Sequence, residues 1–576
     1  MRELSTDILI LGAGGAGLFA ALHAHKENPD LSITVAVKGL LGKCGCTRMV
    51  QGGYNVALAK EDSIERHFMD TIEGGKWLPD QDLAWMLVTL AIERIHELEN
   101  ELGCFFDRNP NGTVHQKAFA GQTFDRTVHK GDLTGIEIIN RLAEQVWTRR
   151  ISRLEEHRAV ELLKDVTGER IAGVLFIDMR TGDYVLVRAK AVMLATGGGP
   201  TMYKYHTPSG DKSCDGLAMA LRAGLPLRDM EMVQFHPTGL LAGTHTRMTG
   251  TVLEEGLRGA GGHLLNGAKE RFMPKYDPLA ERATRDFVSR AMFTEMRKGN
   301  TGPNGGLFIS MGHLDRNFVK KEFRGMVGRC ADCGFDLAGG LVEVVPTAHY
   351  LMGGVEFAPD CRTALEGLFV AGEDAGGVHG ANRLGGNGVA NSTVFGAVAG
   401  DAMAEWVKNE KLREIDLVSL ENALSSCEKP FKAKTSSLEP IRERLYEVMW
   451  QKVGIIRDEG GLRAALSELD SLEKELEGAG VADGNRAFNL TWYDWLNLKS
   501  LVQVSRAIAT AALARTDSRG AHFREDCPET GSLENSFFIR TKMKDGKLET
   551  GTHPVSFTRV KPGQSLLARE AQPASA

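Results

Sequence analysis

Arginine, histidine and glutamate side chains recur in short glycine-rich segments of the middle part of the chain. Arg383 is suited to hold a carboxylate, because a guanidinium meets a carboxylate through two parallel hydrogen bonds. His236 and His349 can donate further hydrogen bonds that polarise a substrate. These residues therefore favour a site that binds and polarises a small carboxylic acid.

A glycine-rich turn near the N-terminus predicts a site for a dinucleotide. Gly12, Gly14 and Gly17 form the pattern G-x-G-x-x-G, which follows an apolar strand at residues 7–11 and precedes a helix. The first glycine allows a tight turn, the second lets the backbone approach a pyrophosphate, and the third permits close packing of helix on strand. Gly15 lies within the same turn and is a further candidate contact.

Two later strand-end segments favour FAD over NAD(P). The first is ATGGG at residues 195–199, which contains Thr196 and Gly197. The second is LFVAGED at residues 368–374, which contains Glu373. In two-lobed flavoproteins such segments bring distant parts of the chain back to one large dinucleotide. A nicotinamide dehydrogenase needs neither of them.

Lys38 ends the second predicted strand, at residues 32–38, and departs from the simplest dinucleotide fingerprint. The residue at this position is usually an acid that holds the ribose hydroxyls. Read alone, the lysine indicates a phosphorylated ribose, and Lys38 is a candidate cofactor contact.

Composition excludes several classes of protein. The 576 residues carry 69 Lys and Arg against 75 Asp and Glu, a net charge of -6, which disfavours general nucleic-acid binding. No run of 18 apolar residues and no secretory signal are evident, so we expect no direct membrane insertion and a cytoplasmic protein. Cys330 and Cys333 form a lone C-x-x-C without a second ligand pair, so we expect no metal site.

Patterning along the chain predicts an α/β fold with four parts. Residues 1–235 and 345–410 are expected to form a doubly wound FAD-binding domain, interrupted by an inserted α+β capping domain at 236–344. Residues 411–516 are rich in Leu, Glu, Ala and Lys and predict a helical bundle, and residues 517–576 predict a small C-terminal domain.

Seven segments in a fixed order resemble the flavoprotein subunit of succinate dehydrogenase and fumarate reductase, of which L-aspartate oxidase is a sister group. They cover nearly the whole chain: QGG at 51–53, QFHPTG at 234–239, EEGLRGAGG at 254–262, ERATRDFVSR at 281–290, PTAHYLMGG at 346–354, HGANRLGGN at 379–387 and SRGAHFRED at 518–526. Members of this family often lack the ribose-binding acid, which lessens the conflict at Lys38.

The resemblance implies roles for individual residues. Arg285 would be the proton donor, and Glu255 with Arg258 would reload it from solvent. Phe119 and Gln122 match a lid-facing segment, and His236, His349 and Arg383 match substrate-binding positions. The implied and predicted cofactor contacts together are Gly12, Gly14, Gly15, Gly17, Lys38, Thr47, Gln51, Gly52, Gly53, Thr196, Gly197, Asp215, Glu373, Asn387 and Val389.

Cys46 marks the first departure from the family. Quinone-linked members carry, just before the QGG segment, a histidine that bonds covalently to the flavin, and Cys46 stands at that place here. The flavin is therefore expected to be held without a covalent bond, although a thioether from Cys46 stays open. Loss of the tether biases the chemistry toward reduction of an unsaturated acid, or toward an oxidase.

Glu254 marks the second departure. The family has Thr or Ser here, whose hydroxyl binds the second carboxylate of the substrate, whereas two facing carboxylates repel unless one is protonated. Either Glu254 turns away and Thr249 or Thr251 substitutes, or the far end of the substrate is an amide, a hydroxyl or a cation.

Three functions follow from these features. The leading one, implied by the resemblance, interconverts fumarate and succinate, or a closely related pair of acids. The chain has no cluster-binding cysteine run, so its electrons must come from elsewhere unless oxygen is the acceptor, and the resemblance implies a separate iron–sulfur subunit as their source. That subunit could place the chain peripherally on the inner face of the cytoplasmic membrane. The second is an oxidase of the L-aspartate type. The third, a flavoprotein that binds a macromolecule, is disfavoured by the acidic charge.

Overall fold

A seven-stranded sheet forms the centre of the molecule, and the computed structural model describes residues 1–243 and 246–567 of the chain. The strand order is β6-β2-β1-β9-β8-β7, and β16 pairs with β9. The strands are β1 (Arg2–Leu11), β2 (Ile33–Val37), β6 (Ile151–Glu155), β7 (His157–Lys164), β8 (Ile171–Asp178), β9 (Tyr184–Leu194) and β16 (Leu368–Val370).

The parallel part of this sheet confirms the predicted strand–helix–strand opening. β1 pairs in parallel with β2 and β9, and β16 pairs in parallel with β9. The turn after β1 and the segments that follow β9 and β16 therefore meet at one edge. β1 begins at Arg2 rather than at residue 7, because β9 offers pairing partners as far as Val185. An antiparallel meander of β7, β8 and β9 extends the sheet.

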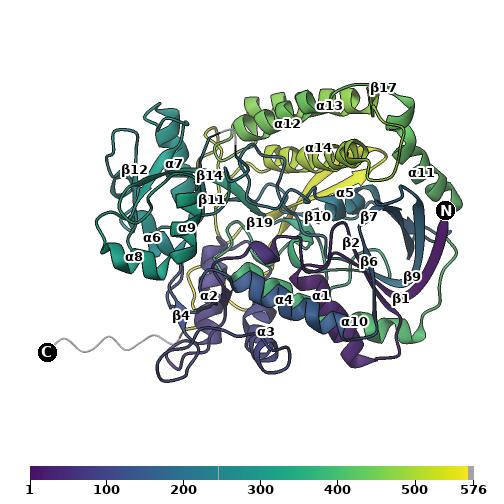
Figure 1. The fold of residues 1–576 in the computed structure, drawn as a ribbon, viewed down its shortest axis with the longest axis horizontal. Helices are drawn as coiled ribbons and strands as arrows, with labels where there is room; N and C mark the ends of the chain where they lie inside the picture. Colours follow the sequence, from purple (N-terminus) through teal and green to yellow (C-terminus); the bar gives the residue numbers. More distant parts are fainter. Residues whose placement is uncertain (244–245, 568–576) are drawn as a thin grey trace.

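Helices cover the lower face of the sheet, as Figure 1 shows. α1 (Gly15–Glu27) and α10 (Asn387–Trp406) cross closely, since a Cβ on Gly400 would lie 2.4 Å from the Ala20 carbonyl oxygen. The neighbouring elements are the helices α2 (Ile64–Gly74), α3 (Gln81–Asn100) and α4 (Thr134–Trp147), the short strands β3 (Tyr54–Asn55), β4 (Gln116–Lys117) and β5 (Thr127–Val128), and 3-10 turns at Thr47–Met49, Gly372–Asp374 and Val407–Asn409.

A separate four-stranded antiparallel sheet, in the order β11-β14-β13-β12, lies on the left of Figure 1 with its own buried core. We call this the capping module. It comprises β11 (Val233–Leu240), β12 (His263–Leu265), β13 (Leu307–Ser310), β14 (Leu341–Leu351), the helices α6 (Gly256–Gly259), α7 (Arg285–Arg297), α8 (Arg316–Glu322) and α9 (Arg324–Asp332), and 3-10 turns at Met273–Lys275 and Ala280–Arg282.

The capping module is joined to the central body through β11 and β14, which pair with each other. Their register shifts twice, between Gln234 and Phe235 and between His236 and Gly239. Such irregularities redirect side chains and are frequent beside functional sites. The predicted limits at residues 236 and 344 fall inside these two strands, and the domain boundaries stay a prediction.

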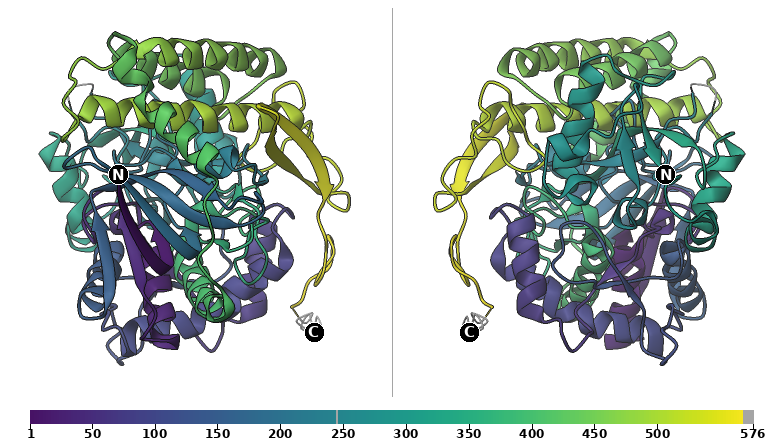
Figure 2. Two further views of the ribbon diagram at one scale, coloured as in Figure 1. Left: turned by 90° about the vertical axis from the view of Figure 1, so that its right-hand side faces the viewer. Right: turned by 90° about the vertical axis from the view of Figure 1, so that its left-hand side faces the viewer.

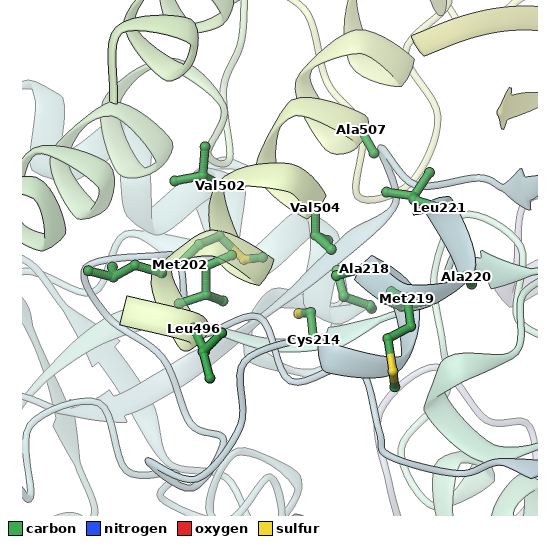
Figure 3. Packing of buried hydrophobic residues seen from close by; sticks show 14 of the residues in the cluster. Met202, Cys214, Ala218, Met219, Ala220, Leu221, Leu496, Val502, Val504 and Ala507 are labelled. Atoms are coloured by element: carbon green, nitrogen blue, oxygen red, sulfur yellow. The ribbon is translucent and has the colours of Figure 1, made fainter. Parts of the chain in front are cut away.

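Four long helices follow the second half of the central body: α11 (Leu417–Lys432), α12 (Glu439–Lys452), α13 (Glu459–Gly478) and α14 (Leu490–Ala514), with the strands β17 (Lys434–Thr435) and β18 (Ala479–Gly480). α14 packs on α5 (Asp215–Arg222), and Figure 3 shows Val504 facing Ala218 and Ala507 facing Leu221. All of these side chains are buried. The burial of these apolar side chains holds α14 against α5.

The C-terminal part completes a sheet that begins much earlier in the chain. The hairpin β19 (Phe537–Lys544) and β20 (Lys547–Pro554) pairs with β10 (Leu227–Arg228), which pairs with β15 (Gly354–Val355). Figure 2 shows this hairpin at the edge of the molecule and the chain running from it past α2 and α3. There Gln81 donates to the Val560 carbonyl at 2.7 Å.

No helix in residues 1–243 or 246–567 is long and apolar enough to cross a membrane. In the same residues, no group of three or more His, Cys, Asp or Glu side chains could hold a metal ion.

Candidate active site

A cavity of about 640 Å³ lies where the central sheet, α10 and the capping module meet. A smaller cavity shares Gly14, Thr196 and Gly197 with it and continues along the glycine turn to Lys38 and Asp215. Together the two form an elongated groove that begins beside β2 and ends under the capping module. This shape fits a dinucleotide rather than a compact ligand.

The glycine turn leaves the room that a pyrophosphate needs. A Cβ on Gly12, whose φ is 113°, would lie 2.1 Å from the Ala195 carbonyl oxygen, and one on Gly17 would lie 2.0 Å from the Gly12 carbonyl oxygen. A Cβ on Gly14 would meet only the Thr47 hydroxyl, at 3.5 Å. Gly12 thus lets the turn approach the segment that follows β9, Gly17 lets α1 approach the turn, and Gly14 leaves the start of α1 open to an anion.

Lys38 has its counter-ion within the protein. Its ammonium donates to the Asp215 carboxylate at 2.9 Å, and Arg158 donates to the same carboxylate at 2.7 Å. Although burial would raise the pKa of Asp215, Arg158 and Lys38 hold it well below its usual range. Asp215 supplies the acid that the end of β2 lacks, so Lys38 does not call for a phosphorylated ribose.

The predicted flavin contacts line the wide end of the groove. Thr47, Gln51, Gly52, Gly53, Glu373 and Val389 all face this cavity. Gly53 has a φ of 150°, and a Cβ there would lie 2.2 Å from the Val128 carbonyl oxygen. Burial raises the pKa of Glu373 to about 7, although its carboxylate accepts from the backbone N–H of Leu351 and Gly199.

Cys46 lines the same cavity, half-buried, at the position where family members carry a histidine. Burial raises the pKa of its thiol to about 12. A thiol with such a pKa stays protonated near neutral pH and is a poor nucleophile.

Arg285, Glu255 and Arg258 form one buried chain of charges in the capping module. The Glu255 carboxylate accepts from Arg285 Nη2 at 2.6 Å and from Arg258 Nη2 at 2.9 Å. Burial would raise the pKa of Glu255, but Arg285 and Arg258 lower it, so the carboxylate stays charged. Arg258 also donates to the Glu281 carbonyl at 2.6 Å. The structure thus brings the three predicted residues together.

Gln234 links this chain to Arg383, and the sequence analysis did not single it out. Its carbonyl oxygen accepts from Arg285 at 3.0 Å and from Arg383 at 3.1 Å. Arg383 also lies over the Tyr350 ring, 4.4 Å from its centroid, and burial lowers its pKa to about 10. The glutamine is present in the segment QFHPTG, but a neutral amide side chain does not by itself indicate a chemical role.

His236 and His349 face each other across the cavity, with ring centroids 5.4 Å apart. Burial, and then the nearby arginines, lower the pKa of each ring well below 6.5, so both are neutral. His236 Nδ1 accepts from the Thr238 backbone N–H at 3.3 Å, which leaves the proton on Nε2. His349 Nδ1 is hydrogen-bonded to the Thr207 hydroxyl at 2.7 Å, a partner that the sequence analysis missed.

Glu254 lines the cavity and is 3% exposed, and its carboxylate has a counter-ion. The ammonium of Lys117, from β4, forms a close ion pair with its carboxylate. Burial raises the pKa of Glu254 while Lys117 opposes the rise. Neither option that the sequence left open describes this arrangement, because Glu254 stays at the cavity wall while Lys117 offsets its charge.

Phe119 is among the residues that line the cavity, whereas Gln122 and Asn387 are not. A Cβ on Gly52 would lie 2.5 Å from the Phe119 ring, which shows how closely the ring covers the flavin end. Gln122 donates to the Gly385 carbonyl at 2.9 Å. The Asn387 side chain is engaged by Asn55, His67 and Thr71, because it starts α10 from within the core.

Comparisons with known proteins agree with this geometry. The family described as "FAD binding domain" matches residues 7–389, and the family described as "Fumarate reductase flavoprotein C-term" matches residues 442–567. FAD is thus the cofactor of this chain.

Two curated relatives extend along most of the chain. An uncharacterised FAD-dependent oxidoreductase of Methanocaldococcus jannaschii is 41% identical and is matched over 92% of this chain and 94% of its own. One of the subunits of the fumarate reductase (CoM/CoB) of Methanothermobacter marburgensis is 39% identical, over 93% of this chain and 97% of its own.

Among solved structures, the flavoprotein of Escherichia coli quinol fumarate reductase superposes with a TM-score of 0.92 at 32% identity, over 98% of this chain and 99% of that chain. These matches confirm a flavin oxidoreductase that acts on CH–CH groups. The chain belongs to the family of succinate dehydrogenase and fumarate reductase flavoprotein subunits.

Proposed function

We propose that the chain reduces fumarate, or a closely related unsaturated acid, to the saturated acid, with Arg383 as carboxylate clamp and Arg285 as proton donor. The observation that carries this proposal is the shared acceptor Gln234, which holds both guanidinium groups at the rim of one cavity. When bound, FAD supplies the hydride that one carbon of the double bond receives.

Arg383, His236 and His349 bind and orient the substrate through charge and through the direction of their hydrogen bonds. Arg383 binds one carboxylate of the substrate with two parallel hydrogen bonds in a site from which water is largely excluded, where such pairs are strongest. His236 and His349 are neutral, so they donate hydrogen bonds without adding net positive charge. Polarisation by these donors makes the double bond accept the hydride.

The proton reaches the second carbon from Arg285. A guanidinium is an unusual acid, since its pKa is normally above about 12, but the carbanion that develops beside it is far more basic. Glu255 receives hydrogen bonds from both arginines and can pass a proton from Arg258 to Arg285. One hydride and one proton thus convert C=C to CH–CH, and Arg285 regains its proton through Glu255.

We also propose that FAD is held without a covalent bond. Cys46 is the cavity residue at the tether position, and its thiol is protonated near neutral pH for the reason given above. The open glycine turn and the Lys38–Asp215 pair support binding by contacts alone.

The electrons are proposed to come from an iron–sulfur subunit. The relative in Methanothermobacter marburgensis is named as one of the subunits of its fumarate reductase, which supports a multisubunit enzyme here as well. Such an assembly would place the chain in the cytoplasm, peripherally at the membrane. The named relatives are reductases, which does not favour the L-aspartate oxidase alternative.

A pair of assays tests the proposed reaction. Fumarate should reoxidise a chemically reduced viologen dye in the presence of the flavin-loaded enzyme. Oxygen uptake with L-aspartate should stay at the level of a blank. The opposite pattern would replace the reductase by an oxidase. As a positional test, Gln234→Leu should lower the rate while leaving FAD bound, because both arginines then lose their common acceptor.

A further inference from the structure

A second cavity, distinct from the active site, lies between α7 and residues 518–530 of the C-terminal part. We call it the α7 cleft. It encloses about 400 Å³ and shares no lining residue with the active-site cavity. An adjoining hollow of about 380 Å³ shares Phe287, Arg290 and Phe523 with it. The cleft is large enough for a small metabolite, and its lining includes the cations Lys76, Arg290 and Arg519 and the acids Asp277 and Asp286.

Arg290 is the most unusual residue of the cleft. Its guanidinium lies 4.7 Å from the ring centroid of Phe523 and 5.3 Å from that of Phe287. In the described part of the chain it has no hydrogen bond and no ion pair, and Asp286 acts on it only from a distance. Burial lowers the pKa of Arg290, and the negative charge of Asp286 opposes the drop. A half-buried guanidinium with unused donors favours an anion.

Two further cations face the same space. Lys76 lines the cleft, and its ammonium makes neither a hydrogen bond nor an ion pair with any residue that the structure describes. Arg519 is 3% exposed; it binds Ser536 and Asp517, but its Nε is buried without a partner. Three cations thus converge on one cleft with donors to spare.

One acceptor is also unused. Asp286 is 8% exposed, lines the cleft, and its Oδ1 is buried without a hydrogen bond. A simple inorganic anion would satisfy the cations and leave this oxygen unpaired. A ligand that carries both a carboxylate and a hydroxyl donor satisfies the cations and also the Asp286 oxygen.

We propose that the α7 cleft is a second binding site for a small hydroxy-carboxylic acid, whose carboxylate pairs with Arg290 and Lys76 and whose hydroxyl donates to Asp286. This site goes beyond the proposed reaction, since it lies outside the flavin cavity. A ligand there would connect α7 of the capping module to residues 518–530. The helix that begins at Arg285 would then be held in place by something other than the substrate.

L-malate and succinate are suitable probes, because they differ by one hydroxyl group. Binding would be measured by calorimetry on FAD-loaded Arg383→Gln enzyme, in which the active-site clamp is removed. We expect one malate per chain, bound about tenfold more tightly than succinate, because a hydrogen bond to a charged group adds that much affinity. Sulfate, which carries no O–H donor near neutral pH, should bind more weakly than malate.

Arg290→Gln, added to this background, is expected to weaken malate binding at least tenfold. Arg297→Gln is the matched control, since Arg297 lies on the same helix but is already paired with Glu525 at 2.8 Å. Lys76→Asn is a second variant, because asparagine tolerates the φ of 60° found at this position. Hydrogen exchange of α7 should slow when malate is added.

Several results would overturn the proposal. The first is the absence of malate binding in Arg383→Gln enzyme, and the second is equal affinity in the Arg290→Gln and Arg297→Gln variants. Equal binding of succinate and malate would remove the hydroxyl contact and with it the ligand class. None of these measurements depends on turnover. A negative result would therefore overturn the second binding site without bearing on the proposed reaction, which the activity assays test.

Discussion

Replacing Lys117 by methionine should weaken binding of fumarate much more than binding of a monocarboxylic substrate such as crotonate. Glu254 is 3% exposed and has the Lys117 ammonium as its counter-ion. Without Lys117 the buried carboxylate faces the far end of the substrate alone. Fumarate carries a second carboxylate at that end, whereas crotonate carries a methyl group.

The size of the effect follows from the burial of the pair. Two like unit charges about 4 Å apart repel by roughly 4 kcal/mol at an effective dielectric constant of about 20. The Lys117 side chain is 20% exposed, so water that replaces it screens part of this repulsion. We therefore expect a loss of about 2 kcal/mol, which is roughly a thirtyfold increase in the KM for fumarate.

The assay is fumarate-dependent oxidation of a reduced dye, run with fumarate and with crotonate. Lys117→Arg keeps the cation and serves as the control. Glu254→Thr removes the acid and leaves the ammonium free, so it should improve fumarate turnover. Burial raises the pKa of Glu254, and loss of Lys117 raises it further. The penalty in Lys117→Met should accordingly shrink as the pH falls and Glu254 gains a proton.

An equal rise of KM for both substrates in Lys117→Met would refute this reasoning, because it would point to a general distortion of the site. An unchanged KM for fumarate, with Glu254→Thr also without effect, would show that the far carboxylate does not approach this pair.

Three further predictions concern the proton donor, the cofactor and acid stability. Arg285→Gln should lower turnover by about 10²–10⁴-fold with unchanged FAD absorbance per chain, and near-normal rates would remove Arg285 from the mechanism. Acid precipitation should release the yellow colour into the supernatant, whereas a coloured pellet that Cys46→Ser abolishes would reveal a thioether. Burial would raise the pKa of Asp215, but Arg158 and Lys38 lower it below 3.8. Its contribution to stability is therefore complete above about pH 4 and is lost as the pH falls further, so the melting temperature should drop there, and less so in Asp215→Asn.

The parts of the fold that could be predicted are those with strong local patterns. The strand at residues 7–11 has a clear apolar pattern, and the turn that follows requires glycines. The structure confirms both. The hairpin β19–β20 was expected only as part of a small separate domain, whereas it extends the sheet that starts at β10. β10 has two residues, and so short a strand leaves no pattern in a sequence.

Some residues of the candidate site could be predicted from the sequence and others could not. Arg383 could be selected because its chemistry is visible in the residue type, whereas Arg285 and Glu255 were selected through the resemblance of their segments to the family. Gln234 and Lys117 could not, because their roles depend on which distant groups the fold brings to them. Gln234 contacts Arg383 across 149 positions of the chain, and Lys117 contacts Glu254 across 137.

The late hairpin has a consequence for how the chain reaches its native state. β10 finds its partner β19 only in residues 537–544, and Gln81 finds Val560 at a separation of 479 positions. β10 and Gln81 are synthesised long before these partners, so the edge of β10 that pairs with β19 stays unpaired until then. Final closure of the cofactor-binding body therefore requires residues 537–560. The interval before it is when the chain most needs protection from aggregation.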